Sequence, residues 1–179
     1  MENVNFIVRP IDQQSPDELD LVTSRSMETV LETIPEFDKN PEKALNVFTN
    51  FTHDQMSAMF QSVFDNPDHE ILVAEDLESG SLLGHTIFSV KTDDEGIRYG
   101  FGFSMYVDPQ ARRRGVGKSL LDAQEAWWSK KSISYALGQT HIENKKLQSL
   151  FTRQGFKISG PMKGEHFKYF ELRKNYGGN

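Results

Sequence analysis

The stretch that decides the fold is MYVDPQARRRGVGK, residues 105–118. It begins at the end of an apolar, strand-like run, turns at Pro109, and then opens an amphipathic helix. The first N–H groups of a helix have no intrahelical partner, and the helix dipole favours negative charge beside them. Gly115 and Gly117 leave the backbone open to a ligand, and Arg112, Arg113 and Arg114 add positive charge. The stretch therefore predicts an anion site, most naturally for a phosphate or a pyrophosphate.

The glycine spacing in this stretch matches neither of the two common nucleotide-binding patterns. It is not the Gly-x-Gly-x-x-Gly of a dinucleotide-binding fold, and it lacks the spacing of a phosphate-binding loop that ends in Gly-Lys-Ser/Thr. A nucleotide-binding domain of those kinds is therefore disfavoured. A simpler interpretation stays open, in which a basic helix start carries glycines only for its turn geometry.

The residues just upstream predict a long strand. Apolar side chains alternate along it at Ile97, Tyr99, Phe101, Phe103, Met105 and Val107. Its other face is mostly small, with Gly100, Gly102 and Ser104 between Arg98 and Tyr106. Small residues allow either a ligand or a packed helix to approach a strand closely. The sequence leaves both alternatives open.

Working outward in both directions, periodicity and capping signals predict a mixed α/β fold. Helices are expected after Ser15-Pro16 up to Pro35, after Asn40-Pro41, after the capping box at Thr52, after Gly115, and over residues 144–153. Strands are expected near residues 6–11, 70–74, 82–91, 97–107, 133–137, 155–158 and 166–172. No linker or repeat divides the chain, so residues 1–179 are expected to form a single domain.

Composition and charge exclude several classes of protein. There is no apolar run near 18 residues and no signal-like start, so neither a membrane span nor secretion is expected and the cytoplasm is the default. With no Cys, the chain has no disulfide, thiolate metal site or cysteine nucleophile. The net charge of −6 disfavours a nucleic-acid partner.

The charge is divided unevenly along the chain. Residues 1–100 carry 6 Lys and Arg against 20 Asp and Glu, whereas residues 101–179 carry 14 against 6. This asymmetry predicts a basic half that holds an anion and an acidic half that faces a cation. Two solvated surfaces of opposite sign are the plainer alternative.

The sequence around residues 105–118 resembles motif A of the GNAT superfamily of N-acetyltransferases. That motif is Gln/Arg-x-x-Gly-x-Gly/Ala after a strand that ends in Val-x-Pro, and it corresponds here to residues 112–117 and to Val107-Asp108-Pro109. A second similarity lies at residues 144–156, where the family has an Asn, a short helix and Leu-Tyr-x-x-x-Gly-Phe. Arg9-Pro10 is similar to the usual opening of the family. The order of expected elements agrees over nearly the whole chain.

The resemblance implies a mixed, mostly antiparallel central sheet of about six or seven strands, with helices on both faces and two strands splayed at the cofactor site. It implies acetyl-CoA as co-substrate, with residues 1–100 on the acceptor side and residues 101–179 on the acyl-CoA side. The residues implied in cofactor binding are Met105, Tyr106 and Val107 for the pantetheine arm, Arg112, Arg113, Arg114, Gly115, Val116, Gly117 and Lys118 for the pyrophosphate, and Asn144. A helix cap is the other interpretation of Asn144.

The chain departs from the family pattern where catalysis is concerned. Members often place an acid or a base at positions that are here Phe151, Gln139, Phe101 and Phe103, none of which ionises. The candidate general base is instead His141, in a loop bordering the acyl end, and the candidate acid is Tyr169. Other ionisable candidates are Glu75, His85, Tyr106 and Glu143, for which a surface or packing role is the alternative.

The acceptor is inferred from acidic residues on the early helices. These are Asp17, Glu18, Asp20, Glu28, Glu32, Glu36, Asp38 and Glu42. An acidic wall would favour a cationic amine such as a polyamine, an aminoglycoside or a lysine side chain. A solvated helix face is the alternative.

These observations predict an acyl-CoA-dependent N-acyltransferase that transfers acetyl directly to a primary amine of a small cationic molecule or a peptide. No metal ion, nucleic acid or membrane is expected as a partner. Homodimers are common in such proteins, and Trp127 and Trp128 or the last strand could supply the surface. The alternative is a non-catalytic module that binds acyl-CoA as a sensor or interaction domain, a hypothesis motivated by Phe151 and Gln139.

Overall fold

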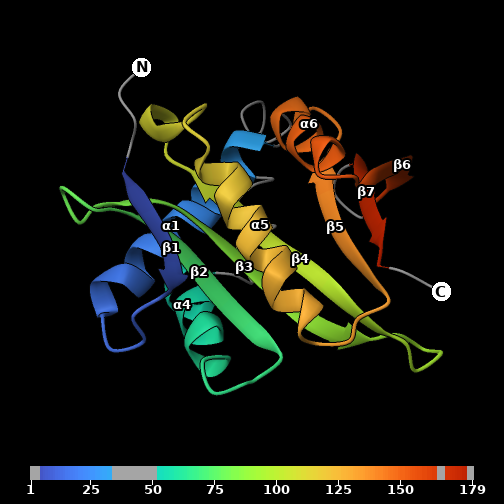
Figure 1. The fold of residues 1–179 in the computed structure, drawn as a ribbon, viewed down its shortest axis with the longest axis horizontal. Coiled ribbons are helices and arrows are strands. Elements are labelled where there is room, and N and C mark those ends of the chain that lie inside the picture. The colour runs from blue at the N-terminus through green and yellow to red at the C-terminus, as the bar shows by residue number, and fades with distance from the viewer. Residues whose placement is uncertain (1–4, 34–51, 165–167, 177–179) are drawn as a thin grey trace.

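Seven strands form one sheet in the order β1-β2-β3-β4-β5-β7-β6 (Figure 1). The computed structural model describes residues 5–33, 52–164 and 168–176. The strands are β1 Phe6–Pro10, β2 His69–Asp76, β3 Leu82–Thr92, β4 Arg98–Val107, β5 Tyr135–His141, β6 Lys157–Lys163 and β7 Lys168–Asn175. Every neighbouring pair is antiparallel except β4 and β5. The predicted mixed, mostly antiparallel sheet is therefore confirmed.

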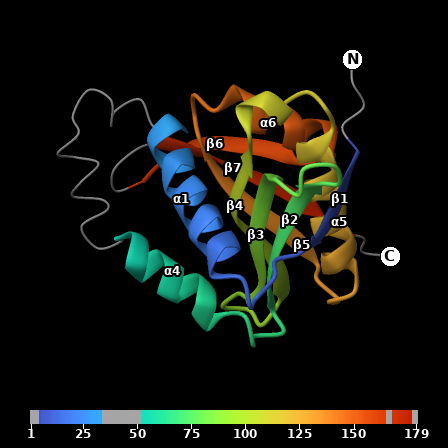
Figure 2. The same cartoon turned by 90° about the vertical axis from the view of Figure 1, so that its left-hand side faces the viewer.

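Helices cover both faces of this sheet. They are α1 Pro16–Thr33, α4 His53–Ser62, α5 Val116–Ser129 and α6 Lys145–Arg153. Figure 2 shows α1 and α4 together on one side of the sheet. One buried cluster joins these two helices to the sheet through Val22, Phe60 and Ile87, and a second joins α5 and α6 to its other face through Leu121 and Phe151. Among the described residues, no helix has the length and apolar character that crossing a membrane requires.

The predicted element boundaries are mostly within two residues of the observed ones. The strand expected at residues 133–137 is β5, which begins at Tyr135 and runs on to His141. Ser134 instead serves a connection, because its N–H donates to the Arg98 carbonyl at 3.0 Å. The helix expected after Asn40-Pro41, and the acidic residues Glu36, Asp38 and Glu42, lie outside the described residues.

The small face of β4 lies under a packed helix at Gly100. A Cβ at Gly100 would lie 2.5 Å from the Trp128 ring, so only glycine fits there. Trp128 is 1% exposed and its indole N–H donates to the Ser89 carbonyl at 3.1 Å. Trp128 therefore belongs to the core, and its suggested role in a dimer surface is wrong. The opposite face of β4 is less covered than its apolar pattern suggests, since Phe103 is 52% exposed.

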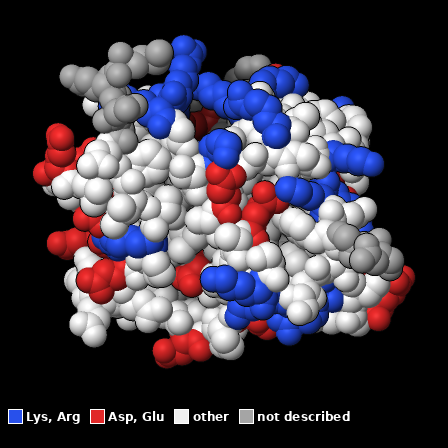
Figure 3. All heavy atoms as spheres, viewed as in Figure 1, with Lys and Arg blue, Asp and Glu red and all other residues white. Residues whose placement is uncertain are grey.

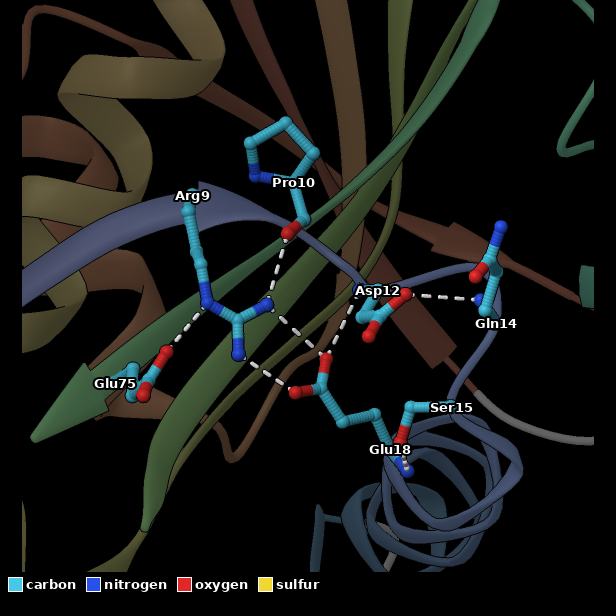
Figure 4. Close-up of polar contacts among 7 residues, drawn as sticks. All are labelled: Arg9, Pro10, Asp12, Gln14, Ser15, Glu18 and Glu75. Carbon is cyan, nitrogen blue, oxygen red and sulfur yellow. Dashed lines mark hydrogen bonds and ion pairs between the residues drawn. The ribbon is translucent and has the colours of Figure 1, made fainter. Parts of the chain in front are cut away.

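An ion-pair network joins α1 to the edge of the sheet (Figure 4). The Arg9 guanidinium binds Glu18 through two hydrogen bonds, of 2.6 and 3.1 Å, and also pairs with Glu75. The hydrogen bond from Arg9 holds the pKa of Glu18 below its usual value. Glu75, an early candidate for proton transfer, and Glu18, an early candidate for the acceptor wall, are thus both engaged in holding the fold together.

Candidate active site

The two parallel strands β4 and β5 separate partway along their length. They pair from Tyr99–Tyr135 to Gly102–Gly138 and no further. On the other side of β4, successive β3 residues pair with Ser104 and Gly102, which leaves Phe103 as an extra residue in a β-bulge. A bulge bends its strand and increases the local twist. The structure therefore contains the expected splay, and the bulge at Phe103 explains it.

The end of β4 presents backbone groups to the splay. The Val107 carbonyl faces away from β3, because it accepts a hydrogen bond from Arg112 Nε at 2.9 Å. Successive residues of a strand direct their backbone groups to alternate edges, so Met105 faces the same way as Val107. Beyond Gly102 this edge has no partner on β5. It can therefore pair with an extended ligand much as it would pair with another strand.

The helix that follows β4 begins without a side-chain cap. Gly115 stands at the N-cap in the left-handed region, with φ 89°, which favours glycine. Its carbonyl accepts the first helical bond, from Ser119 N at 2.9 Å, while no side chain caps the N–H groups of Val116, Gly117 and Lys118. The first turn of α5 also contains no acidic residue. The helix start can therefore accept an anion.

The three arginines before α5 do different things. Arg112 turns back, donating to the Val107 carbonyl and, at 3.4 Å, to Glu32 on α1. Arg113 and Arg114 are exposed on the loop. In Figure 3 basic side chains gather at the top of the view, where Figure 1 places the start of α5 and α6. The exposed pair can meet an anion directly, whereas the side chain of Arg112 is placed to hold the loop against β4 and α1.

Asn144 caps α6. Its side-chain oxygen accepts a hydrogen bond from the Leu147 N–H at 3.2 Å, so the cap interpretation is correct. This bond leaves the amide NH₂ of Asn144 available for a ligand. Phe151, on the same helix, is 5% exposed and packs against Phe156 with ring centroids 4.8 Å apart. The position where the family often has a tyrosine acid is thus a core position here.

The two predicted proton-transfer residues lie side by side. His141 is the last residue of β5, so its predicted place in a loop is wrong. It is the register partner of Tyr169 on β7, and such partners share one face of a sheet. His141 is 4% exposed, and its Nδ1 accepts a hydrogen bond from the Glu143 N–H at 3.1 Å. In the neutral ring the proton is then on Nε2. The accepting nitrogen of this tautomer, Nδ1, is occupied by the Glu143 N–H, so a base role requires that bond to open.

His85 is buried beneath the β4 bulge. It is 1% exposed, contacts Ser26 Oγ at 3.1 Å through Nε2, and stacks on Tyr106 at 5.9 Å. Burial, with a smaller contribution from the Arg25 charge, lowers the pKa of His85 to about 3. His85 is therefore neutral near pH 7, and its pKa is too low for an efficient general base there. Burial raises the pKa of Tyr106 above its usual value.

The acidic residues of α1 are spread along its length rather than gathered at the splay. Glu32 contacts Arg112 beside the end of β4, whereas Asp17 and Asp20 line an open cleft of about 540 Å³ with His53 and Asp54 on α4. At a rise of 1.5 Å per residue, Asp17 and Glu32 are about 22 Å apart along the helix. Asp17 and Asp20 therefore lie far from the splay, and Glu32 is near it.

Sequence reasoning missed two groups that support the site. Arg25 donates to the Leu82 carbonyl at 2.8 Å and to Asp108 at 3.2 Å, and lies over the Tyr106 ring. Gln124 is buried in α5 at the edge of a small cavity in the splay. A signal for Gln124 existed, because it follows Leu120 and precedes Trp128 at helical spacing on the apolar stripe. A polar residue on such a stripe indicates a buried partner or a ligand.

The comparisons with known proteins agree with this geometry. The model of the acetyltransferase (GNAT) family matches residues 35–156. No curated protein matches the sequence. Among solved structures, the chain is similar to yncA from Salmonella typhimurium, solved with its cofactor acetyl-CoA, at 17% identity and TM-score 0.73, over 98% of this chain and 96% of that one.

Two further structures show the same fold. PaiA N-acetyltransferase from Thermoplasma acidophilum, in complex with coenzyme A, aligns at 18% identity and TM-score 0.72, over 96% of this chain and 99% of that one. An N-acetyltransferase from Staphylococcus aureus Mu50 aligns at 19% identity and TM-score 0.69, over 96% and 98%. At these identities the likeness shows the fold, and the family match covers most of the chain. The chain belongs to the GNAT acetyltransferase family.

Proposed function

We propose that this protein is an acyl-CoA-dependent N-acyltransferase that transfers acetyl from acetyl-CoA directly to a primary amine, in the cytoplasm. The observation that carries the proposal is the splay of β4 from β5 beside the uncapped start of α5. Two of the similar structures hold acetyl-CoA or coenzyme A. An uncapped helix start next to an open strand edge would suit both the pyrophosphate and the extended arm of such a ligand.

Each part of the ligand has a matching group on the protein. The N–H groups of residues 113–118 would bind the pyrophosphate, with the Arg113 and Arg114 charges beside it. The edge of Met105 to Val107 would pair with the amides of the pantetheine arm, and the Asn144 amide lies at the start of α6, across the splay. Arg112 would contribute by fixing the loop. No metal ion is required for this chemistry.

The transfer forms a bond from the amine nitrogen to the acyl carbon and breaks the bond from that carbon to sulfur. The amine proton must leave and the thiolate must gain a proton. Since the chain has no Cys, a cysteinyl acyl-enzyme intermediate is ruled out. His141 remains our candidate base and Tyr169 our candidate acid. Much of the rate would come from holding the two reactants in line.

His141→Ala tests the first of these roles. Loss of a general base should lower kcat about a hundredfold or more and change its pH profile. Tyr169→Phe is the matched change for the acid, because it removes one hydroxyl and leaves the ring. If kcat and its pH dependence are unaltered in His141→Ala, His141 is not the base.

The acceptor is proposed to be cationic, either a small polyamine-like molecule or a lysine side chain. The support is the acidic C-terminal part of α1, where Glu28 and Glu32 act electrostatically on Tyr106 at the end of β4. Part of the Glu32 charge is offset by Arg112, at 3.4 Å. Glu28→Gln should therefore raise the KM for a cationic acceptor more than Glu32→Gln does, with little effect on the KM for acetyl-CoA.

A second candidate function is an acyl-CoA-binding module without catalysis. It is favoured by Phe151 in the core, by Gln139 where a carboxylate would serve, and by the low pKa of His85. Thiol release from acetyl-CoA separates the two functions, using polyamines, aminoglycosides, amino acids and lysine peptides as acceptors. Because the protein has no Cys, a thiol reagent detects only liberated coenzyme A. Turnover supports the enzyme, whereas binding of acetyl-CoA without turnover supports the module.

A further inference from the structure

One buried amide in the splay has a donor with no partner. Gln124 on α5 is 1% exposed, and its Oε1 accepts a hydrogen bond from Thr86 Oγ1 at 2.5 Å. That length suits a hydroxyl donating to oxygen and is short for an N–H donor. The other acceptor near the same hydroxyl, the Ser104 carbonyl, is farther away, at 3.3 Å. Gln124 Nε2 has no hydrogen-bond partner within the described part of the chain. A buried donor left unsatisfied is destabilising, so a group that satisfies it would bind favourably.

This donor lies at a cavity in the splay. The cavity measures about 30 Å³, and its lining includes Gln124, Gly102, Gly138 and Phe151. Gly102 and Gly138 form the last residue pair before β4 and β5 separate. A Cβ at Gly102 would lie 3.5 Å from Gln124 Nε2, and a Cβ at Gly138 would lie 3.8 Å from the Phe151 ring. Two side chains are thus absent where the strands part, and the amide lies directly beneath the opening.

The chemistry of the cavity indicates the kind of group that Gln124 would bind. The lining of the cavity contains no charged residue: besides Gln124 and Thr86 the polar side chains are Ser104 and Gln139, and the apolar ones are Phe103, Met105, Phe151 and Leu172. Such a lining disfavours a charged ligand atom and accepts a neutral one. The amide NH₂ is a donor, so its partner must be an acceptor. A carbonyl oxygen satisfies both conditions.

We propose that Gln124 Nε2 donates a hydrogen bond to a carbonyl oxygen of acyl-CoA bound in the splay. The inference rests on the proposed acyl-CoA binding and adds a residue to it. The carbonyl belongs either to an amide of the pantetheine arm or to the thioester. Thr86 positions the amide by holding its oxygen, so that the NH₂ is directed into the cavity.

Gln124→Met tests the proposal, because methionine has nearly the same shape and no donor. The Kd for acetyl-CoA, measured by titration calorimetry, should rise about three- to tenfold. The Tm of the protein alone should change little, because losing the unsatisfied Nε2 donor offsets losing the acceptor of the Thr86 hydroxyl. That hydroxyl keeps the Ser104 carbonyl, at 3.3 Å, as an acceptor. Coenzyme A, which lacks the thioester, identifies the carbonyl. If the carbonyl belongs to an arm amide, the affinity for both ligands should fall. If it is the thioester carbonyl, only the affinity for acetyl-CoA should fall.

Gln148→Met is the matched control for stability. Gln148 is also a buried glutamine, on α6, but its Nε2 donates to the carbonyls of His141 and Ile142 at 3.2 and 2.9 Å. Its Tm should fall, since two backbone acceptors lose their donor. Gly102→Ala is a second binding variant, because its added methyl group has no contact under 3.5 Å and reduces the space beside the amide. It too should weaken acetyl-CoA binding.

The outcomes separate this inference from the proposed function. If the unmodified protein binds neither ligand, both are wrong. If it binds, but Gln124→Met binds with the same Kd and has a lower Tm, Gln124 serves only the fold and the inference is wrong. If affinity falls while Tm holds, and Gly102→Ala weakens binding as well, Gln124 contacts the ligand.

Discussion

The helices α4 and α5 begin in opposite ways. At the start of α4, Thr52 accepts from the Gln55 N–H at 3.3 Å and Gln55 accepts from the Thr52 N–H at 2.9 Å, and Asp54 adds negative charge in the first turn. The start of α5 has a glycine N-cap, no capping side chain and no acid. A glycine N-cap is roughly a few tenths of a kcal/mol less stabilising than a capping side chain. The open start of α5 therefore leaves N–H groups that a bound anion can stabilise further.

The start of α1 supports the same distinction. Asp17 and Glu18 occupy its first turn, and Ser15 Oγ accepts from the Glu18 N–H at 3.3 Å. Both helices on the α1–α4 face therefore satisfy their own first turns. At α5, beside the splay, there is neither a capping side chain nor an acid, and the charge just before the helix is positive, supplied by Arg113 and Arg114. The difference marks α5 as the helix whose start is completed from outside the chain.

The largest effect is expected from Gly117→Glu, which would give α5 the acidic first turn that α1 and α4 have. The added carboxylate would repel an anion at the helix start, and its Cβ would lie 3.4 Å from the side chains of Leu150 and Val107. The Kd for acetyl-CoA should rise about a hundredfold or more. Calorimetry measures this, and circular dichroism checks that the variant is folded. If the folded variant binds acetyl-CoA with unchanged affinity, the assignment of an anion site to the start of α5 is wrong.

A smaller effect should separate the three arginines. Arg113→Ala and Arg114→Ala should each raise the Kd for acetyl-CoA about three- to tenfold, less at high salt, without lowering Tm. Arg112→Ala should lower Tm, because the Val107 carbonyl and Glu32 lose its contacts. If all three variants lose affinity for acetyl-CoA equally and keep the same Tm, the distinction between Arg112 and the other two arginines is wrong.

Thr52→Ala should remove the cap of α4 and leave the cofactor side alone. The free energy of unfolding should fall by about 1 kcal/mol, since the N–H of Gln55 loses its acceptor. Urea denaturation measures the change. Affinity for acetyl-CoA should stay as it is, because α4 packs on the opposite face of the sheet from α5. A weakened ligand affinity would mean that the two faces are coupled.

The smallest effect is expected from pH at the start of α1. The pKa of Glu18 is lowered in the folded protein from its ordinary 4.5 by the hydrogen bond from Arg9. Its contribution to stability is therefore complete above pH 4.5 and is lost as the pH falls through the lower, folded pKa. In Glu18→Gln, the free energy of unfolding, measured by denaturation between pH 3 and 6, should decrease less as the pH falls than it does in the unmodified protein. If the free energy of unfolding depends on pH in the same way in both proteins, the Arg9–Glu18 contact does not contribute to that dependence.

Much of the fold could be predicted because its signals are local. The capping box at Thr52, the Ser15-Pro16 helix start and the strand alternation before Val107 each depend on a few neighbouring residues. The resemblance at residues 105–118 then implied how these elements are arranged in one mostly antiparallel sheet. These predictions hold for every element inside the described residues, with shifts of a few residues at ends such as β5.

The details of the site could not be predicted, because they depend on residues distant in sequence. From the sequence alone, Arg112 could equally have contacted a bound anion. In the structure it contacts Glu32, which is 80 residues away. The tautomer of His141 follows from a loop N–H, and the low pKa of His85 follows from burial under α1 and β4. The bulge at Phe103 exists only in relation to β3. Each of these is a property of tertiary packing.

The short parallel pairing between β4 and β5, here called the seam, has a mechanical consequence. Four residue pairs join a four-stranded half of the sheet, β1 to β4, to a three-stranded half, β5 to β7. A ligand lying in the splay would act as an inserted strand segment that lengthens this short seam. A bound ligand would then reduce the motion of the two halves relative to each other. Slower amide hydrogen exchange at Met105 and Gln139, on the two sides of the seam, would record this effect.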